Sequence, residues 1–281
     1  MILFKKSNQL SRHIRHAQSN GMKIAMIPTM GALHPGHLSL IDAGKGSGCL
    51  TVCTIFVNPT QFNDPKDYQK YPVTLEKDIY QLEKKKTDLL FLPNVEEVYP
   101  DGLPKDEKYE LGQLEKVFEG QFRPGHFQGV CQVMSRLLSI VQPDHLFMGQ
   151  KDYQQCMVIK WLINHMKLKT IFHASPTVRE PDGLAMSSRN LRLNEEQRKK
   201  AVAIFESLAY IKKNLSMGSV IDLLEKARTD LKAKGFKIDY LDIADADNLE
   251  AVNTWNGKQK LVTLAAAFLD EIRLIDNMLL N

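Results

Sequence analysis

The sequence predicts an α/β protein, with a parallel sheet covered by helices on both faces and a smaller C-terminal α+β domain. Over about the first 175 residues, short apolar runs alternate with segments of helical periodicity, as in βαβ units. After a turn at residues 181–183, two helices and then two strands replace that alternation. We therefore expect a first domain over residues 1–176 and a second over 177–281. The length of 281 residues suits one large domain or two ordinary ones.

The expected elements follow in chain order. In the first domain we expect strands over 23–27, 50–57, 88–92, 144–148 and 169–174, a helix from near His37, and helices over 74–86, 129–142 and 153–166. Residues 93–128 are rich in proline and charge and predict irregular structure. In the second domain, Asn194 is the expected N-cap of a helix reaching Leu215, and Gly235 ends another over 219–234. Strands are expected over 237–243 and 260–268.

Composition excludes several classes of protein. Hydrophobic residues make up 43% and charged residues 25%, so the chain can pack a sizeable core and is not mainly disordered. The net charge is only +4 and no run is strongly basic, so we expect no nucleic-acid partner. No segment approaches the ~20 apolar residues of a membrane span, and the N-terminal apolar stretch is too short for a signal peptide. We expect no membrane partner.

The four scattered cysteines favour reduced thiols and a cytoplasmic location. Cys49 and Cys53 flank a strand-like run, so both should face the same side of the sheet. As no second pair completes a zinc site, we interpret them as small core residues.

The carboxyl edge of a parallel sheet is where ligands bind, and the first such edge lies at residues 28–37. A strand leads through a glycine-containing loop to a helix whose start carries His34 and His37. A helix N-terminus offers free N–H groups and partial positive charge, and imidazoles one turn apart can donate to phosphate oxygens. The pattern therefore favours an anion site. A capped helix start with incidental histidines is the alternative, and a metal pair lacks a third ligand.

The glycine-rich segment 44–48 resembles a phosphate loop but fails its motif, because Cys49 stands where Ser or Thr is required. We interpret it as the flexible end of the first helix. No G-x-G-x-x-G follows an expected strand, so a dinucleotide site of the usual kind is not predicted.

Three later segments bring further polar groups to strand ends. Asn58 and Gln61 offer neutral amides that can orient a hydroxyl or carboxylate. Lys151 follows a strand and can stabilise phosphate charge, with Gln155 one turn on. The 186–190 loop combines two hydroxyls with a guanidinium that can clamp phosphate. Taken singly, each also fits a bland alternative: a polar turn, a solvated lysine or a serine-rich surface turn.

The joint order of these motifs resembles the nucleotidylyltransferase superfamily, whose members attack the α-phosphate of ATP. Within it, the chain is similar over nearly its whole length to the pantothenate synthetase (pantoate–β-alanine ligase) family. The stretches that carry the resemblance are Pro28–His37, Phe56–Phe62, Arg123–Phe127, Gly149–Gln155, Asp182–Asn190 and Arg273–Asn277.

The resemblance implies a Rossmann-like first domain, a cytoplasmic homodimer, and an ATP-dependent ligase reaction in two steps. Pantoate's carboxylate attacks the α-phosphate of ATP, which gives pantoyl adenylate and pyrophosphate. The amine of β-alanine then displaces AMP to form pantothenate. Mg²⁺ would bridge the phosphates, as a hard cation that keeps several waters.

The resemblance also implies roles for particular residues. His34, His37, Lys151 and Arg189 would be catalytic. Gln61 and Gln155 would bind pantoate, and Gln61 would also bind β-alanine. Asp78 and Gln81 match a possible Mg²⁺ contact, with a solvated helix residue as the alternative for Asp78. ATP would be bound by Met30, Gly31, Ala32, Leu33, His34, Pro35, Gly36, His37, Gly149, Gln150, Lys151, Asp152, Val178, Met186, Ser187, Ser188 and Arg189.

One position departs from the family, since Gln150 stands where Glu is usual. Glutamine keeps an acceptor but loses the charge, so we expect a tolerated change. Two alternatives to the ligase remain: a nucleotidyltransferase without the amide-forming step, and a non-catalytic module that binds nucleotide or tRNA. The amides of Gln61 and Gln155 favour the ligase, because a simple nucleotidyltransferase need not hold a small hydroxy acid.

Overall fold

The computed structural model describes residues 1–62, 68–104 and 107–281. The chain forms two compact units, one of residues 1–150 with 154–176 and the other of 151–153 with 177–281. The expected division at 176/177 places Lys151–Tyr153 in the first unit, whereas the structure groups them with the second. The reason is local, because Asn277 Nδ2 donates to Lys151 O at 2.7 Å and the Tyr153 hydroxyl donates to Ala246 O at 2.7 Å.

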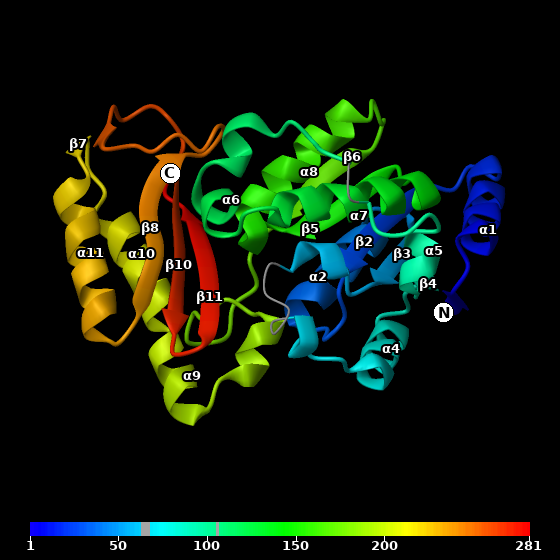
Figure 1. Cartoon of the computed structure of the whole chain (residues 1–281), viewed down its shortest axis with the longest axis horizontal. Coiled ribbons are helices and arrows are strands. Elements are labelled where there is room, and N and C mark those ends of the chain that lie inside the picture. The colour runs from blue at the N-terminus through cyan, green and yellow to red at the C-terminus, as the bar shows by residue number, and fades with distance from the viewer. Residues whose placement is uncertain (63–67, 105–106) are drawn as a thin grey trace. The chain divides into compact units, whose positions relative to one another are not determined.

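The first unit is built on a six-stranded parallel sheet in the order β1-β4-β3-β2-β5-β6 (Figure 1). The strands are β1 (Ile2–Phe4), β2 (Ile24–Thr29), β3 (Leu50–Ile55), β4 (Leu89–Phe91), β5 (His145–Gly149) and β6 (Ile171–Ser175). The predicted α/β class is confirmed, and the sequence analysis missed only β1 among these strands. Strand order reverses between β2 and β5, which is the switch point where α/β sheets bind ligands.

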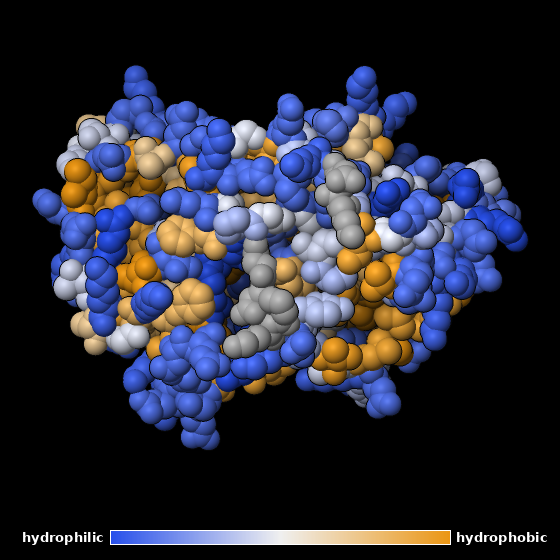
Figure 2. Space-filling view, viewed as in Figure 1, coloured by the Kyte–Doolittle hydropathy of each residue, from blue (hydrophilic) through white to orange (hydrophobic). Residues whose placement is uncertain are grey.

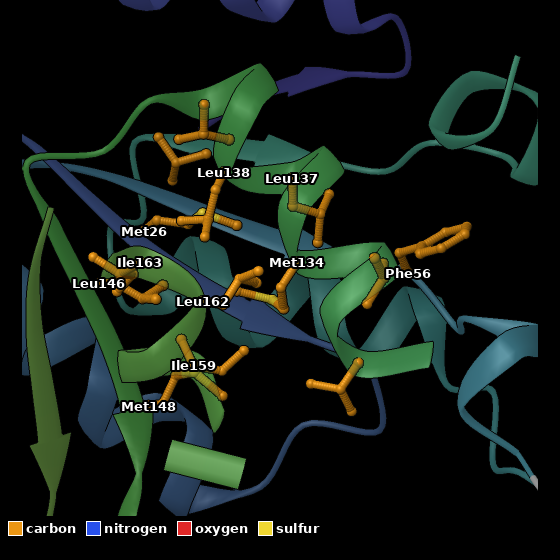
Figure 3. Packing of buried hydrophobic residues seen from close by; sticks show 14 of the residues in the cluster. Met26, Phe56, Met134, Leu137, Leu138, Leu146, Met148, Ile159, Leu162 and Ile163 are labelled. Carbon is orange, nitrogen blue, oxygen red and sulfur yellow. The ribbon is translucent and has the colours of Figure 1, made fainter. Parts of the chain in front are cut away.

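Helices cover both faces of this sheet because the strand residues alternate between two apolar clusters. In β2, Ile24 and Met26 join a cluster with α1 (Ser7–Ser19), α7 (His126–Val141) and α8 (Tyr153–His165). Figure 3 shows part of that cluster, with Met26 and Leu146 facing Leu138 and Leu162. The intervening Ala25 and Ile27 face α2 (Pro35–Gly46) and α4 (Leu75–Lys84).

The stretch 93–128 is less irregular than expected. It holds α5 (Val95–Val98), the 3₁₀ turn η2 (Gly112–Glu115) and α6 (Phe118–Phe122). Residues 105 and 106 of that stretch lie outside the described residues. These elements are too short to show a helical period, so sequence periodicity could not find them.

The sheet opens where the site begins. β2 and β5 pair only at Ala25–His145 and Met26–Leu146, although both strands continue toward their carboxyl ends. Pro28 lies in the diverging part of β2 and has no N–H to donate across the gap. The backbone between the two strands is therefore unlinked at the switch point.

The second unit carries a three-stranded antiparallel sheet in the order β11-β10-β8. Its strands are β8 (Lys237–Asp245), β10 (Leu261–Leu269) and β11 (Ile272–Leu279), and its helices are α9 (Glu195–Ala201), α10 (Ala203–Asn214) and α11 (Ile221–Ala233); β7 (Gly218–Ser219) and β9 (Thr254–Trp255) form a separate pair. The expected helix from Asn194 to Leu215 is in fact two helices that meet at Val202. The N-cap prediction is confirmed, since Asn194 and Gln197 form a capping box.

All four cysteines are free thiols and buried. Cys49 and Cys53 belong to the same apolar cluster, as their spacing predicted. Burial raises the pKa of the Cys53 thiol to about 12, so it stays protonated at neutral pH.

Hydrophilic side chains dominate the face shown in Figure 2. Within the described ranges, no helix has the length and apolar character of a membrane span.

Candidate active site

The loop between β2 and α2 has an unusual backbone that its sequence permits. Gly31 has φ +79° and Ala32 has φ +48°, so two consecutive residues lie in the left-handed region. Glycine tolerates this conformation, whereas alanine stores about 1–2 kcal/mol of strain there. Such a loop persists only if its surroundings hold it, and here a buried carboxylate does so.

Asp78, in α4, is that carboxylate. Its Oδ2 accepts the Ala32 N–H at 2.9 Å, and its Oδ1 accepts the Leu33 N–H at 2.8 Å and the Thr74 hydroxyl at 3.0 Å. The residue is only 1% exposed, so the alternative of a solvated helix residue is wrong. A β-carbon on Gly31 would lie 3.2 Å from Asp78 Oδ2, which explains why the loop carries no side chain there.

The expected Mg²⁺ contact at Asp78 and Gln81 does not fit a resident metal. Both Asp78 oxygens already accept backbone or hydroxyl donors, and the side chain is only 1% exposed, whereas Mg²⁺ keeps several waters and prefers carboxylates that are open to solvent. Gln81 Oε1 is buried with no hydrogen-bond partner among the described residues, but one amide oxygen is not a cation site. Across the described parts of the chain, no three His, Cys, Asp or Glu side chains are grouped to hold a metal.

His34 and His37 lie at the start of α2, with ring centroids 4.0 Å apart. His34 is the N-cap, and its Nδ1 accepts the Gly36 N–H at 3.2 Å. A ring nitrogen that accepts is unprotonated, so the proton of His34 lies on Nε2. The His34 ring therefore carries an N–H donor at the start of α2, at the switch-point edge of the sheet.

One detail of the expected anion site is wrong. Pro35 has no N–H, the Gly36 N–H donates to the His34 ring, and the His37 N–H donates to His34 O at 2.8 Å. The sequence alone suggested that the first turn of α2 offers free N–H groups to a ligand. In the structure these N–H groups are already bonded within the turn. An anion here would be bound by the imidazoles and by the helix dipole.

The segment after β3 separates two amides that the sequence treated alike. Asn58 is fully buried; its Nδ2 donates to Gly129 O at 3.1 Å, and its Oδ1 accepts the Tyr99 hydroxyl at 3.0 Å. It therefore holds α7 and cannot orient a substrate. Gln61, at the end of the 3₁₀ turn η1 (Pro59–Gln61), is half-buried, and its side-chain amide bonds to no described residue.

The backbone of Gln61 is held by the Arg123–Phe127 stretch, for which the sequence suggested no role. His126 Nδ1 donates to Gln61 O at 2.8 Å, and Arg123 Nη2 donates to it at 3.4 Å. Gly129 lets α7 approach η1 closely, since a β-carbon there would lie 2.1 Å from Thr60 O. In the sequence, only the R-P-G-H-F motif at residues 123–127 could have indicated that this stretch holds the Gln61 backbone.

The segment after β5 forms the 3₁₀ turn η3 (Gln150–Asp152) and then α8. Gln155 is half-buried, and its amide bonds to no described residue, as with Gln61. Its neighbour Gln154 is buried and instead binds the backbone of Glu119, Leu114 and Val117. Carboxyl ends of β3 and β5 flank that of β2, so the first unit brings Gln61 and Gln155 to the edge that carries the histidine pair.

Lys151 and the 186–189 segment both belong to the second unit. Lys151 is half-buried, and its ammonium forms no ion pair with the described residues. Residues 178–186 form a hairpin in which the Met186 N–H donates to Val178 O at 3.0 Å. Ser187 then caps the 3₁₀ turn η4 (Ser188–Arg192) by accepting the Arg189 N–H at 3.3 Å.

The first unit also contains a cavity of about 440 Å³ beside the strained loop. Met30, Gly31, Ala32 and Asp78 line it together with apolar residues such as Phe56 and Leu92. The histidine pair, Gln61 and Gln155 are not in its wall. The cavity thus adjoins the candidate site without containing its polar groups.

A Rossmann-like parallel sheet with a histidine pair at its switch point is typical of a nucleotide-dependent enzyme. Residues 2–279 match the family described as Pantoate-beta-alanine ligase. The chain belongs to this family.

Several relatives are similar over their whole length. The pantothenate synthetase of Bacteroides thetaiotaomicron is 40% identical over 272 residues, which cover 96% of this chain and 95% of the relative. The crystal structure of the Thermus thermophilus pantothenate synthetase has a TM-score of 0.90 at 37% identity and covers 99% of each chain. A Francisella tularensis pantoate-beta-alanine ligase in complex with beta-gamma ATP and beta-alanine has a TM-score of 0.82 at 36% identity, covering 99% of this chain and 97% of its own.

Proposed function

We propose that the protein condenses pantoate with β-alanine at the expense of ATP, giving pantothenate, AMP and pyrophosphate. The observation that carries the proposal is the match to the pantoate-beta-alanine ligase family over residues 2–279, together with the histidine pair at the switch point. The Francisella relative, which binds a form of ATP and beta-alanine, supports two of the three substrates.

The reaction has two displacements. A carboxylate oxygen of pantoate attacks the α-phosphorus of ATP, the bond to the bridging oxygen breaks, and pyrophosphate leaves. The β-alanine nitrogen then attacks the acyl carbon of pantoyl adenylate, the C–O bond breaks, and AMP leaves as the nitrogen loses a proton. Mg²⁺ enters as part of the ATP substrate, where it neutralises phosphate charge.

Each candidate residue has a role that its environment supports. His34 donates from Nε2 and His37 acts as phosphate stabiliser or general acid, as ATP lies along Met30–His37. Lys151 and Arg189 stabilise the charge that develops on the α-phosphate and the leaving pyrophosphate. The remaining nucleotide contacts are Gly149, Gln150, Asp152, Val178, Met186, Ser187 and Ser188.

The half-buried amides of Gln61 and Gln155 hold pantoate, and Gln61 also meets β-alanine. Neutral amides suit this task, because a lysine or arginine there would bind the carboxylate that must attack. The pantoyl adenylate must also be kept from water. We further propose a cytoplasmic homodimer: the four free thiols support the location, and sedimentation of the purified protein tests the dimer.

The decisive experiment measures AMP and pantothenate with ATP, Mg²⁺, pantoate and β-alanine, omitting each in turn. We expect both products only in the complete mixture, and pyrophosphate without β-alanine. AMP formation that does not need pantoate, or an adenylated product and no pantothenate in the complete mixture, would refute the ligase. Lys151→Ala should lower kcat more than about tenfold, whereas the exposed Lys237→Ala in the same unit should not change it.

A further inference from the structure

The Arg273–Asn277 stretch matches the family, yet none of the roles above uses it. It lies in β11, an edge strand of the second-unit sheet. Within it, Asp276 is 5% exposed and Asn277 is 3% exposed. Burying a carboxylate and an amide is costly unless each is fully paired, so their partners indicate their purpose.

Asp276 forms a bidentate pair with Arg179, 97 residues earlier in the chain. Arg179 Nη1 donates to Asp276 Oδ2 at 2.6 Å, and Nη2 donates to Oδ1 at 3.0 Å. The same guanidinium donates to Gly183 O at 3.0 Å and to Asn277 O at 3.2 Å, and it lies 4.9 Å from the Phe205 ring centroid. Four hydrogen bonds and one ring contact thus fix the Arg179 guanidinium.

Arg179 belongs to the hairpin that leads into the 186–189 segment. The backbone of Arg179 bridges to Ala185, and the Glu180 N–H closes the turn by donating to Leu184 O at 2.8 Å. Because the hairpin is short and its turn is tied to the Arg179 guanidinium, its position on β11 is set by Asp276. The serines and Arg189 follow within four residues of its end.

Asn277, the next residue of β11, contacts the backbone of Lys151, the second proposed cation. Its Nδ2 donates to the backbone oxygen of Lys151 at 2.7 Å. Lys151 lies in a 3₁₀ turn of only three residues, which has little regular hydrogen bonding of its own. The Asn277 bond therefore constrains the point from which the Lys151 side chain starts.

We propose that Asp276 and Asn277 are positioning residues for the adenylation step. Asn277 sets the backbone of Lys151, and Asp276, through Arg179, sets the hairpin that carries Arg189. Adjacent positions on one strand thereby fix the spacing between the two cations. The proposal rests on the proposed function, and a misplacement of about 1 Å can lower a rate by about 100-fold.

The test is a double-mutant cycle in pantothenate formation. Asn277→Ala should lower kcat about tenfold or more, and Asn277→Thr, which suits a strand but cannot reach Lys151 O, should match it. In a Lys151→Ala background, Asn277→Ala should cost no more than about twofold further, because the group it positions is gone. Arg179→Lys should likewise lower kcat in the unaltered enzyme, and in an Arg189→Ala background it should cost no more than about twofold further.

Asp239→Asn is the matched control. It breaks the ion pair with Arg273, on the same strand, in which Arg273 Nε lies 2.8 Å from Asp239 Oδ2 and both side chains are below 20% exposed. Its kcat should stay within about twofold of the unaltered enzyme, at a similar loss of thermal stability.

Two results would overturn the inference. If Asn277→Ala and Asn277→Thr keep near-native kcat while Lys151→Ala is slow, positioning by β11 is wrong and the ligase proposal stands. If the losses multiply in the double variants, Asn277 and Arg179 act on turnover independently of Lys151 and Arg189, and the positioning role is wrong. Native-like turnover of Lys151→Ala itself would remove Lys151 from the mechanism, and the inference about Asn277 with it.

Discussion

The substitution Asp78→Asn tests whether Asp78 anchors the backbone of the Met30–His37 loop or binds a metal. In the unaltered protein the two carboxylate oxygens accept the N–H groups of Ala32 and Leu33. Asparagine keeps one acceptor, but its NH₂ group would then face a backbone N–H donor. Because Asp78 is 1% exposed, the new NH₂ group cannot turn to bulk solvent, and we expect one peptide of the loop to move.

The magnitude follows from the lost bonds. A hydrogen bond to a charged group contributes about 1.5–3 kcal/mol, and the displaced N–H adds about 1–3 kcal/mol if it stays buried and unpaired. Relief of the Ala32 strain returns about 1 kcal/mol. We expect a net loss of about 1.5–5 kcal/mol, or a Tm lower by roughly 5–15 °C.

The assay combines thermal unfolding with ATP titrations at several Mg²⁺ concentrations. We expect KM for ATP to rise about tenfold or more, with the Mg²⁺ requirement unchanged, because the loop that we propose contacts ATP moves while no metal ligand is lost. Asp42→Asn, an exposed substitution in α2, is the control and should alter neither quantity. A native Tm with a raised Mg²⁺ requirement would show that Asp78 binds the metal after all.

Two further substitutions test how the first unit is held. Gly129→Ala places a β-carbon 2.1 Å from Thr60 O, where real contacts stay beyond 3.0 Å, so η1 must shift by about 0.9 Å. Overpacking of this kind costs about 1–3 kcal/mol and should raise KM for pantoate through Gln61, whereas Gly46→Ala, with open space around it, should be neutral or stabilising in a Tm and KM comparison. Hydrogen bonds from Ser7 lower the pKa of Glu97 to about 2, so its stabilisation is complete above pH ~4.5 and is lost as the pH falls through about 2. Glu97→Gln should therefore be about 1–2 kcal/mol less stable than the unaltered protein at pH 7 by denaturant unfolding, and a difference that does not shrink toward pH 2 would contradict this assignment.

Periodicity was sufficient for most of the fold because most elements are long or buried on one face. The βαβ order, the two-unit pattern and the Asn194 cap all came from local signals. The first strand and helix were missed since β1 has three residues and α1 begins at Ser7 without an N-cap bond from its own Lys6. β11 was missed as a strand because its polar residues at 276 and 277 interrupt the apolar alternation that signals one.

The candidate site shows a different limit, because a residue type does not reveal whether its side chain is buried. Asn58 and Gln61 read as two equivalent amides, yet Asn58 is fully buried against α7 while the Gln61 side chain bonds to nothing described. Asp78 read as a metal contact or a solvated residue, whereas the structure shows a buried carboxylate that accepts two backbone N–H groups. Its partners lie 45 and 46 residues away, a separation at which no local pattern carries information.

Only a few residues of each motif are proposed to react, and the others hold these residues in place. The proposed reacting groups are His34, His37, Lys151 and Arg189, and all but His37 start from a loop or a short turn that cannot fix its own geometry. Buried polar residues from distant elements supply that rigidity, as Asp78 does for the loop before His34 and Asn277 does for Lys151. A substitution among these buried residues should therefore lower kcat or raise KM without removing any group that touches substrate, which is how the positioning residues can be told from the catalytic ones.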